Sequence, residues 1–387
     1  MAESPVTGRS GLTRTAAAYG LGLMTLLNFV NYIDRYILPA VAEQVRQALS
    51  LTDTEIGLIG SAFLFSYFIL SPLFGYLGDR LSRPRLMALG VAIWSLATAG
   101  GGLARNLWQM LVARGAVGVG EASYASISPA LISDYYPADR RGRVFAIFYL
   151  AIPVGSAVGY LLGGAIEPRW GWRAAFFAVG LPGLLLALLT LTAPDPPRGI
   201  NDQPTALRPA PGSFMAALGR LLGNRDYVLA VIGYAAYTFA IGGMSFWMPT
   251  YLERVMHLTT ARANYVLGVV TVVAGIGGTF LGGYIADALA RRIRQAHLWV
   301  SGVSMALAVP FTCVAFTSSR LEVLVPSLLA AEFMAFLSTG PINVVIVSVV
   351  PVALRATAMS ISIFVIHLLG DAAAPTVIGA VSHRVGL

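Results

Sequence analysis

The stretch Asn31-Tyr32-Ile33-Asp34-Arg35 places a carboxylate next to a guanidinium inside an apolar run that extends from Tyr19 to Val41. The run is long enough to span a membrane as a helix. Charged side chains at bilayer depth are costly, so they usually face an interior cavity and pair with one another. Asp34 and Arg35 are therefore candidate functional residues.

A second pair of opposite charges, Arg114 and Glu121, lies in a later apolar segment. The two residues are seven positions apart, which is two helical turns, so both side chains point to the same face of a helix. We expect a water-accessible cavity in which Asp34, Arg35, Arg114 and Glu121 compensate one another's charge. Such a cavity can be reset by a proton or by a charged substrate.

The composition is that of a polytopic membrane protein, with 57% hydrophobic and only 11% charged residues in 387. The net charge of +8 comes from arginines that cluster between the apolar segments, which favours loops facing anionic lipid and argues against nucleic-acid binding. Cys313 is the only cysteine, and the four histidines show no ligand spacing, so we expect no metal and no cofactor. Arg9 and Arg14 lead directly into the first long apolar run, which indicates an uncleaved first transmembrane helix.

Eleven apolar runs of about 20 residues each can be marked along the chain. They cover residues 15–41, 54–77, 86–104, 107–132, 143–166, 174–193, 227–252, 262–287, 296–317, 321–349 and 357–381. Arginines are dense in every second loop, as at 80–85, 140–143 and 291–294. The positive-inside rule places these loops and the N-terminus in the cytoplasm.

The two halves of the chain repeat each other. Asp79 and Asp287 end similar Gly-Tyr-containing motifs 208 residues apart, and Arg141 and Arg355 follow matched prolines 214 residues apart. This repeat predicts an all-α fold of two pseudo-symmetric six-helix bundles, at 1–193 and 226–387, joined by a Pro- and Arg-rich cytoplasmic linker at 194–225. Five helices are visible in the second bundle, and the twelfth helix is absent from this sequence.

Gly75-Tyr-Leu-Gly-Asp-Arg-Leu-Ser-Arg-Pro-Arg85 resembles the signature loop of the major facilitator superfamily. Its small residues let two helices approach, while its Asp can stabilise a helix N-terminus and its arginines can bind carboxylates or lipid phosphates. We expect this loop to latch one conformation of a transporter, although it could also be a charge cluster that merely keeps the loop inside. The predicted gating residues are Gly75, Gly78, Asp79, Arg80, Arg83, Arg141, Asp287 and Arg355.

Four stretches together look like the spinster branch of that superfamily. They are Asn31–Tyr36, Phe74–Arg80, Arg114–Tyr124 and Phe148–Tyr160. The match is strong across residues 28–190 and only general in the C-terminal half. The resemblance implies a twelve-helix, alternating-access transporter, with lysolipid or sphingosine-phosphate type substrates in the animal members and coupling to protons as the usual proposal. It also implies a monomer, and we expect a bacterial member in the inner membrane.

The chemistry of the charged residues suggests their roles. A carboxyl group such as Glu121 or Asp34 holds a proton in apolar surroundings and releases it when it faces Arg35 or Arg114. A cavity that alternates these surroundings binds and releases a proton. The alternative is a static buried ion-pair network that fixes helix packing.

Several residues are candidates for substrate binding. Arg114 or Arg35 can bind a phosphate or carboxylate headgroup, with hydrogen bonds from Asn31, Tyr124 and Tyr160. In the C-terminal half the polar intramembrane residues are Glu332, Asn343, His367 and Asp371. Asn343 and His367 are included among the substrate-binding candidates. His367 and Asp371 are four residues apart and could form a second proton relay, or simply an interhelical hydrogen bond.

The favoured function is a proton-coupled secondary transporter of an amphipathic or lipid-like anion. A multidrug exporter ranks second, because an exporter of cations would need an unpaired acid in the cavity. A lipid scramblase or uniporter stays open. The sequence lacks the G-x-S-x-G and H-E-x-x-H motifs of hydrolases and the nucleotide-binding loop of ATP-driven pumps, which argues against an enzyme.

Overall fold

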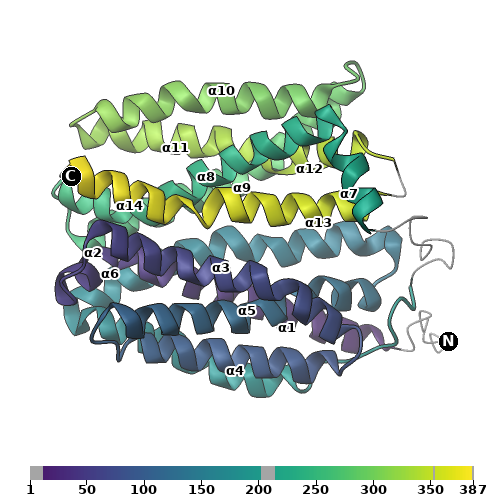
Figure 1. The fold of residues 1–387 in the computed structure, drawn as a ribbon, viewed down its shortest axis with the longest axis horizontal. Coiled ribbons are helices and arrows are strands. Elements are labelled where there is room, and N and C mark those ends of the chain that lie inside the picture. The colour runs from purple at the N-terminus through teal and green to yellow at the C-terminus, as the bar shows by residue number, and fades with distance from the viewer. Residues whose placement is uncertain (1–11, 202–213, 352–353, 386–387) are drawn as a thin grey trace, which may run out of the picture. The chain divides into compact units, whose positions relative to one another are not determined.

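The computed structural model describes residues 12–201, 214–351 and 354–385, and these residues form helices and no strands (Figure 1). The helices of the N-terminal part are α1 (Arg14–Ala40), α2 (Ala42–Ala48), α3 (Asp53–Gly78), α4 (Arg83–Gly101), α5 (Leu107–Tyr135) and α6 (Ala138–Thr190). The C-terminal part contains α7 (Phe214–Leu222), α8 (Arg225–Arg254), α9 (Thr260–Ala290), α10 (Ala296–Thr317), α11 (Leu321–Leu337), α12 (Thr339–Ser348), α13 (Arg355–Ile366), the π-helical turn η3 (His367–Asp371) and α14 (Ala374–Val385). The predicted all-α class is confirmed.

Eight helical stretches of the described chain are long and apolar enough to cross a membrane. One of them belongs to α6, whose 53 residues contain two of the expected apolar runs. Gly171 separates these runs with a backbone φ of 77°, a left-handed conformation that glycine adopts without steric cost. The molecule is thus a multi-pass membrane protein.

The chain divides into two compact units. Unit 1 comprises Met1–Leu51 and Leu58–Arg208, and unit 2 comprises Thr52–Gly57 and Pro209–Leu387. The first residues of α3 group with unit 2 because the Asp53 carboxylate accepts hydrogen bonds from Arg254 of α8, at 2.7 and 2.9 Å, and from Ser382 of α14 at 2.7 Å. Residues 202–213 of the expected linker lie outside the described residues.

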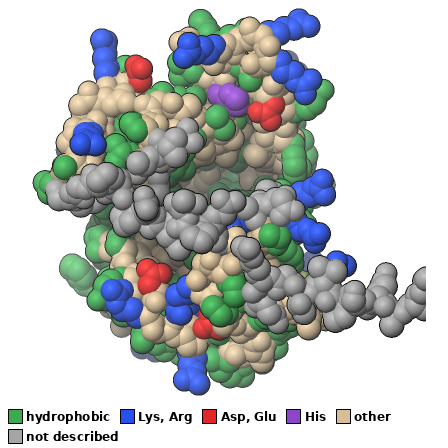
Figure 2. Space-filling view, turned by 90° about the vertical axis from the view of Figure 1, so that its right-hand side faces the viewer, with side chains coloured by type: hydrophobic (Ala, Val, Ile, Leu, Met, Phe, Trp, Pro, Cys, Tyr) green, Lys and Arg blue, Asp and Glu red, His purple; other side chains and the backbone are tan. Residues whose placement is uncertain are grey.

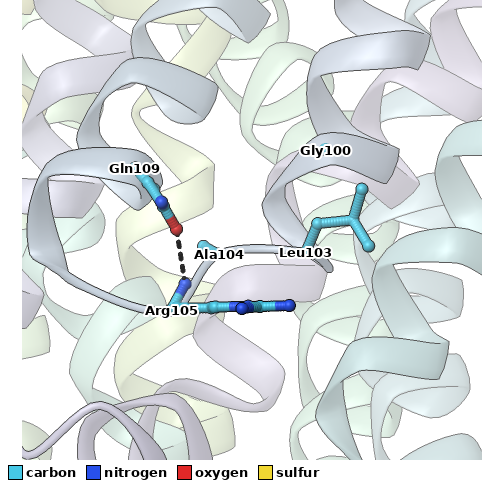
Figure 3. Close-up of a pocket in the computed structure, with 5 residues that line it drawn as sticks. All are labelled: Gly100, Leu103, Ala104, Arg105 and Gln109. Atoms are coloured by element: carbon cyan, nitrogen blue, oxygen red, sulfur yellow. Dashed lines mark hydrogen bonds between the residues drawn. The ribbon is translucent and has the colours of Figure 1, made fainter.

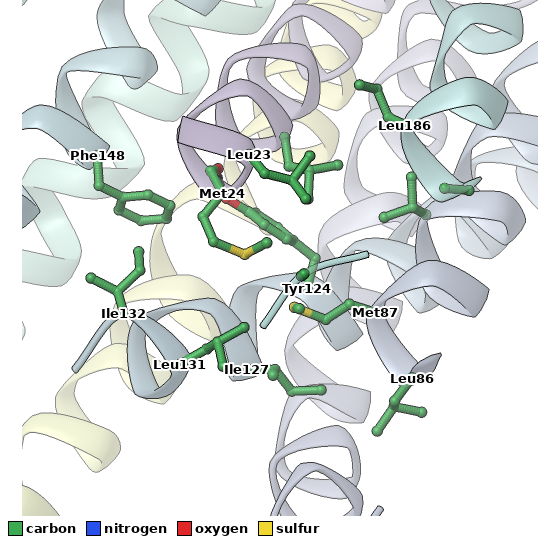
Figure 4. Close-up of a cluster of buried hydrophobic side chains, with 14 of the residues drawn as sticks. Leu23, Met24, Leu86, Met87, Tyr124, Ile127, Leu131, Ile132, Phe148 and Leu186 are labelled. Atoms are coloured by element: carbon green, nitrogen blue, oxygen red, sulfur yellow. Dashed lines mark hydrogen bonds between the residues drawn. The ribbon is translucent and has the colours of Figure 1, made fainter. Parts of the chain in front are cut away.

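Unit 1 has a core of apolar side chains from α1, α4, α5 and α6. Figure 4 shows part of it, with Tyr124 of α5 surrounded by Met24 and Met87. Phe148 and Leu186 of α6 belong to the same cluster. Apolar burial of this kind does not by itself hold helices together in lipid, so close packing must contribute.

Glycines provide that close packing around the charged residues. A Cβ atom on Gly155 of α6 would lie 2.6 Å from the carbonyl oxygen of Phe29, and one on Gly159 would lie 2.8 Å from that of Ile33. A Cβ on Gly118 of α5 would overlap the carbonyl oxygen of Phe63 in α3. Small residues therefore let α1, α3, α5 and α6 approach closely at the level of Asp34 and Arg35.

Unit 2 has its own core, built from α7, α8, α12 and α13. Tyr227 of α8 is buried in it and donates a hydrogen bond of 2.8 Å from its hydroxyl group to the carbonyl oxygen of Ala358. Helix α11 packs against α9 and α10 beside this core. The π-helical turn η3 lies against α8, where Thr238 donates to the carbonyl oxygen of Ile366 at 3.0 Å.

Candidate functional site

The four charged residues predicted to meet do lie together, between α1 and α5 in unit 1. Arg35 of α1 donates from Nε to Oε2 of Glu121 in α5 at 2.8 Å. The Glu121 side chain is fully buried, and 15% of the Arg35 side chain is exposed. The hydrogen bond between these two charged groups lies in a low-dielectric environment, which strengthens it. Removing either partner would leave a buried charge uncompensated.

The second ion pair joins the same two helices, but here the arginine is on α5 and the carboxylate is on α1. Arg114 of α5 lies with Nη1 3.4 Å from Oδ1 of Asp34 in α1. The hydroxyl group of Thr98 in α4 donates to the other oxygen of Asp34. Each arginine therefore binds the carboxylate of the facing helix. The Asp34 carboxylate also accepts a hydrogen bond from a third helix, α4.

Aromatic rings surround the Arg35 guanidinium. Its central carbon lies 5.0 Å from the ring centroid of Tyr32, 5.1 Å from that of Phe63 and 4.8 Å from that of Tyr67. The Arg114 guanidinium lies 5.1 Å from the same Phe63 ring. Cation–π contacts favour the charged guanidinium in a desolvated position. These rings were not among the predicted site residues, although Phe63 and Tyr67 are four residues apart on one face of α3.

Three buried polar atoms near the ion pairs have no hydrogen-bond partner in the described chain. They are Nδ2 of Asn31, Nε of Arg114 and Oε1 of Glu121. Buried polar atoms are usually satisfied, and the Asn31 amide lies close enough to the Glu121 carboxylate to interact with it, so these atoms indicate binding capacity beside the ion pairs. A small polar ligand or a proton could use it.

The two tyrosines predicted to bind substrate are buried in unit 1. Tyr124 donates a hydrogen bond of 2.8 Å from its hydroxyl group to the carbonyl oxygen of Met24, and its ring packs edge-on against Trp94. Tyr160 of α6 lies edge-on against Tyr36, with 5.0 Å between the ring centroids. Both side chains belong to the packed interior in this conformation.

The two substrate-binding candidates of the C-terminal half lie in unit 2. Asn343 of α12 donates from Nδ2 to the carbonyl oxygen of Thr339 at 2.8 Å. His367 lies with Nδ1 3.0 Å from Oδ1 of Asp371, so this predicted pair is in contact. Both members of the pair belong to η3, and π-helical turns are frequent at functional sites.

The expected signature loop contains an exposed part and a buried part. Asp79 is exposed and has no side-chain partner among the described residues, and Arg80 stacks on the Tyr76 ring at 3.5 Å. Gly75 has open space around it, whereas a Cβ on Gly78 would lie 2.8 Å from the Ile127 side chain. Only Gly78 therefore serves the close helix approach expected of this loop.

Arg83 is the buried centre of this region, with 3% of its side chain exposed. It donates from Nε to Oδ1 of Asp195 at 2.7 Å, and from its terminal nitrogens to the Asp134 carboxylate and to the carbonyl oxygen of Pro196. Burial disfavours its charge, but the hydrogen bonds to Asp134 and Asp195 raise the pKa of the Arg83 guanidinium above its ordinary value. Arg83 is one of the predicted gating residues, whereas neither carboxylate was predicted from the sequence.

The linker residues that follow α6 fold back onto this region. The backbone N–H of Gly199 donates to Asp134 at 2.8 Å, and Arg198 donates to the carbonyl oxygen of Gly78 at 2.9 Å. The start of the expected linker is thus tied to the ends of α3 and α5.

The other expected gating residues lie apart from Arg83. Arg141 donates to the carbonyl oxygens of Ser133 at 2.9 Å and Tyr136 at 3.2 Å, near the end of α5. In unit 2, Asp287 is largely exposed and lies 3.2 Å from Nε2 of His297. The side chain of Arg355 lies outside the described residues. Figure 2 shows arginine side chains along one face of the molecule.

A pocket at the turn between α4 and α5 contains none of the predicted site residues. It is lined by Gly100, Leu103, Ala104, Arg105 and Gln109 (Figure 3). The Gln109 side chain accepts a hydrogen bond of 2.8 Å from the backbone N–H of Arg105, so the turn is held by its own contacts. The described residues contain no group of acidic, histidine or cysteine side chains suited to a metal ion.

Comparison with known proteins places this geometry in a family. The model of the Major Facilitator Superfamily matches residues 24–375. The human protein spinster homolog 1 is 33% identical over 97% of this chain and 75% of its own length. The zebrafish (Danio rerio) protein spinster homolog 3 is 32% identical over 96% of this chain and 78% of its own length.

Solved structures of similar fold support the same family assignment. A bacterial homolog to the human lysosomal transporter spinster, in an inward-facing and unoccupied conformation, has a TM-score of 0.87 and 26% sequence identity, and the match covers 96% of this chain and 84% of that one. A D-xylose–proton symporter shares the fold, with a TM-score of 0.74 and 19% identity, over 94% of this chain and 89% of that one. The family consists of transporters and not of enzymes. The chain therefore belongs to the major facilitator superfamily and, within it, to the spinster family of membrane transporters.

Proposed function

We propose that this transporter is coupled to protons and moves an amphipathic or lipid-like anion by alternating access. The observation that carries the proposal is the Arg35–Glu121 ion pair of 2.8 Å, in which the second oxygen of Glu121 is buried without a partner. A proton can be added to that oxygen while Arg35 stays in contact with the other one.

Protonation of Glu121 would change the state of Arg35. The neutral acid attracts the guanidinium far less than the carboxylate does, so Arg35 would become available to an anion. The same argument applies to Asp34 and Arg114, whose separation of 3.4 Å makes the weaker of the two pairs. Proton binding and anion binding are then linked, because each changes the partner that the arginines hold.

The two arginines also suggest the class of substrate. Guanidinium groups bind phosphate or carboxylate through parallel hydrogen bonds, and Asn31 adds an amide donor beside them. The apolar and aromatic side chains around Arg35 suit an acyl chain. A lysophospholipid or a sphingosine-phosphate type lipid combines both features.

The remaining residues are assigned as further proposals. Tyr124, Tyr160, Asn343 and His367 would contact substrate in conformations that open the cavity. The Arg83 cluster, with Gly78 and Arg141, would hold one conformation closed at the cytoplasmic ends of the helices. We also propose a monomer in a bacterial inner membrane, with the N-terminus in the cytoplasm.

The test is proton movement in proteoliposomes, read with an internal pH dye, when a lysophospholipid or sphingosine-phosphate gradient is imposed. Wild type should move protons, and Glu121→Gln should not. Glu322→Gln is the matched control, because Glu322 is exposed and lies outside the site. Lipid movement without protons in wild type would instead indicate a uniporter or scramblase, and no lipid movement would favour a drug exporter.

A further inference from the structure

A single carboxyl group is buried in α11 of unit 2. Glu332 is 9% exposed, and no hydrogen bond or ion pair joins it to another described residue. It lies on the buried face of the helix, four residues after Leu328 and three before Ala335, and both of these are buried. Glu332 is therefore turned toward protein and not toward open lipid.

The helices around α11 bring no cation near the middle of the span. Helices α8, α9, α10 and α12 pack against it. Apart from tyrosines and Cys313, their titratable residues lie near the helix ends: Arg225, Asp226, Glu253 and Arg254 in α8, Arg262 and Asp287 in α9, and His297 in α10, with none in α12. The environment of Glu332 is thus set by burial alone.

The internal repeat relates Glu332 to a residue of the proposed site. Glu121 and Glu332 are 211 residues apart, between the separations of 208 for Asp79 and Asp287 and 214 for Arg141 and Arg355. Glu332 therefore lies within one helical turn of the position in the second half that corresponds to Glu121. Both carboxyl groups are buried in corresponding helices, α5 and α11.

The two halves differ in the partner of this carboxyl group. Pro39 of α1 and Pro249 of α8 are 210 residues apart and align α1 with α8, the first membrane-spanning helix of the second half. By that alignment, Ser245 stands where the first half has Arg35. A buried carboxyl group thus recurs in the corresponding helix of the second half, whereas the arginine does not.

We propose that Glu332 is a proton-binding site of the C-terminal half, separate from the ion pairs of the N-terminal half, and that it carries a proton in this conformation. A buried carboxylate without a cation is strongly disfavoured, whereas the neutral acid costs far less to bury. Glu121 can ionise against Arg35, but Glu332 has no such partner. The role of this proton in transport rests on the proposed proton coupling, while its presence on Glu332 does not.

The test is infrared spectroscopy of the purified full chain, comparing wild type with Glu332→Gln at neutral pH. A protonated carboxyl group has a carbonyl stretching band that a carboxylate lacks, and an ordinary Glu is ionised at this pH. The difference spectrum should show the loss of one such band. Glu322→Gln should lose none, because Glu322 lies in the same helix but is exposed and paired with Arg320 at 2.9 Å.

Glu332→Asp keeps the carboxyl group and should shift the band without removing it. This variant shows whether a band lost in Glu332→Gln reflects loss of the carboxyl group and not misfolding. Equal carbonyl bands in wild type and Glu332→Gln would overturn the proposal. This outcome is independent of the proteoliposome test, which can fail through Glu121 while the Glu332 band is present.

Discussion

Arg35 binds Glu121 across two helices, although Glu121 shares its own helix face with Arg114. Arg114 of α5 instead pairs with Asp34 of α1, at the longer distance of 3.4 Å. Each helix thus contributes one acid and one base, and neither ion pair forms within a helix. Any change in the separation of α1 and α5 acts on both pairs at once, which is why we regard the four residues as one coupled unit.

Neutral replacements of the two acids should separate coupling from folding. Asp34→Asn and Glu121→Gln each keep the side-chain shape and remove the negative charge, so we expect coupled flux to be abolished in both while the protein stays folded. Size-exclusion chromatography and the proton-flux assay measure the two effects. Loss of folded, monodisperse protein in both variants would support the static ion-pair network instead.

Thr98→Val should change the pH dependence of transport. The Thr98 hydroxyl donates to the Asp34 carboxylate and so stabilises its ionised form. Without that donor the Asp34 carboxylate loses one of its hydrogen bonds, so the pH profile of proton-coupled flux should differ from that of wild type. Thr25→Val is the control, because the Thr25 hydroxyl donates to the carbonyl oxygen of Leu21 in its own helix at 2.8 Å. Equal profiles for Thr98→Val and wild type would remove Thr98 from the proton site.

The sequence predicted the helical class, the repeat and the four charged residues, because each of these follows from local composition or from spacing within one helix. It did not predict which arginine meets which acid. Arg83 and its partners Asp134 and Asp195 are 51 and 112 residues apart, and no periodicity relates them. Thr98 was not predicted either. A single hydroxyl group in an apolar helix usually donates to the backbone of its own helix, so the sequence gives no sign that it binds Asp34.

Glycine replacements in α5 should test the packing that brings the charged residues together. A Cβ on Gly118 would overlap the Phe63 carbonyl oxygen and the Ser66 hydroxyl group of α3, so Gly118→Ala should lower the free energy of unfolding by about 1–3 kcal/mol. Gly115→Ala is the matched control in the same helix, because nothing lies within 4 Å of the added atom. It should leave stability unchanged or raise it slightly. Thermal unfolding in detergent compares the two, and equal midpoints would show that α3 and α5 are not tightly packed at Gly118.

Arg83→Ala should be the most destabilising of these variants. It would leave the Asp134 carboxylate, with 6% of its side chain exposed, and the Asp195 carboxylate without their common cation. Removing one partner of a buried ion pair typically costs about 3–5 kcal/mol. Arg83→Lys should restore little of this, because one ammonium group cannot reach both carboxylates and the carbonyl oxygen of Pro196 in the geometry of a guanidinium.

Arg85→Ala provides the comparison for Arg83→Ala, since Arg85 is an exposed arginine two residues away and should change stability by about 0.5 kcal/mol at most. Thermal unfolding of the purified variants measures both. If the two alanine variants unfold alike, the linker segment at 195–199 is not anchored by Arg83. If only Arg83→Ala is destabilised, limited proteolysis should also cut that segment faster than in wild type, because the bonds from Arg83 to Asp195 and Pro196 hold it against α4 and α5.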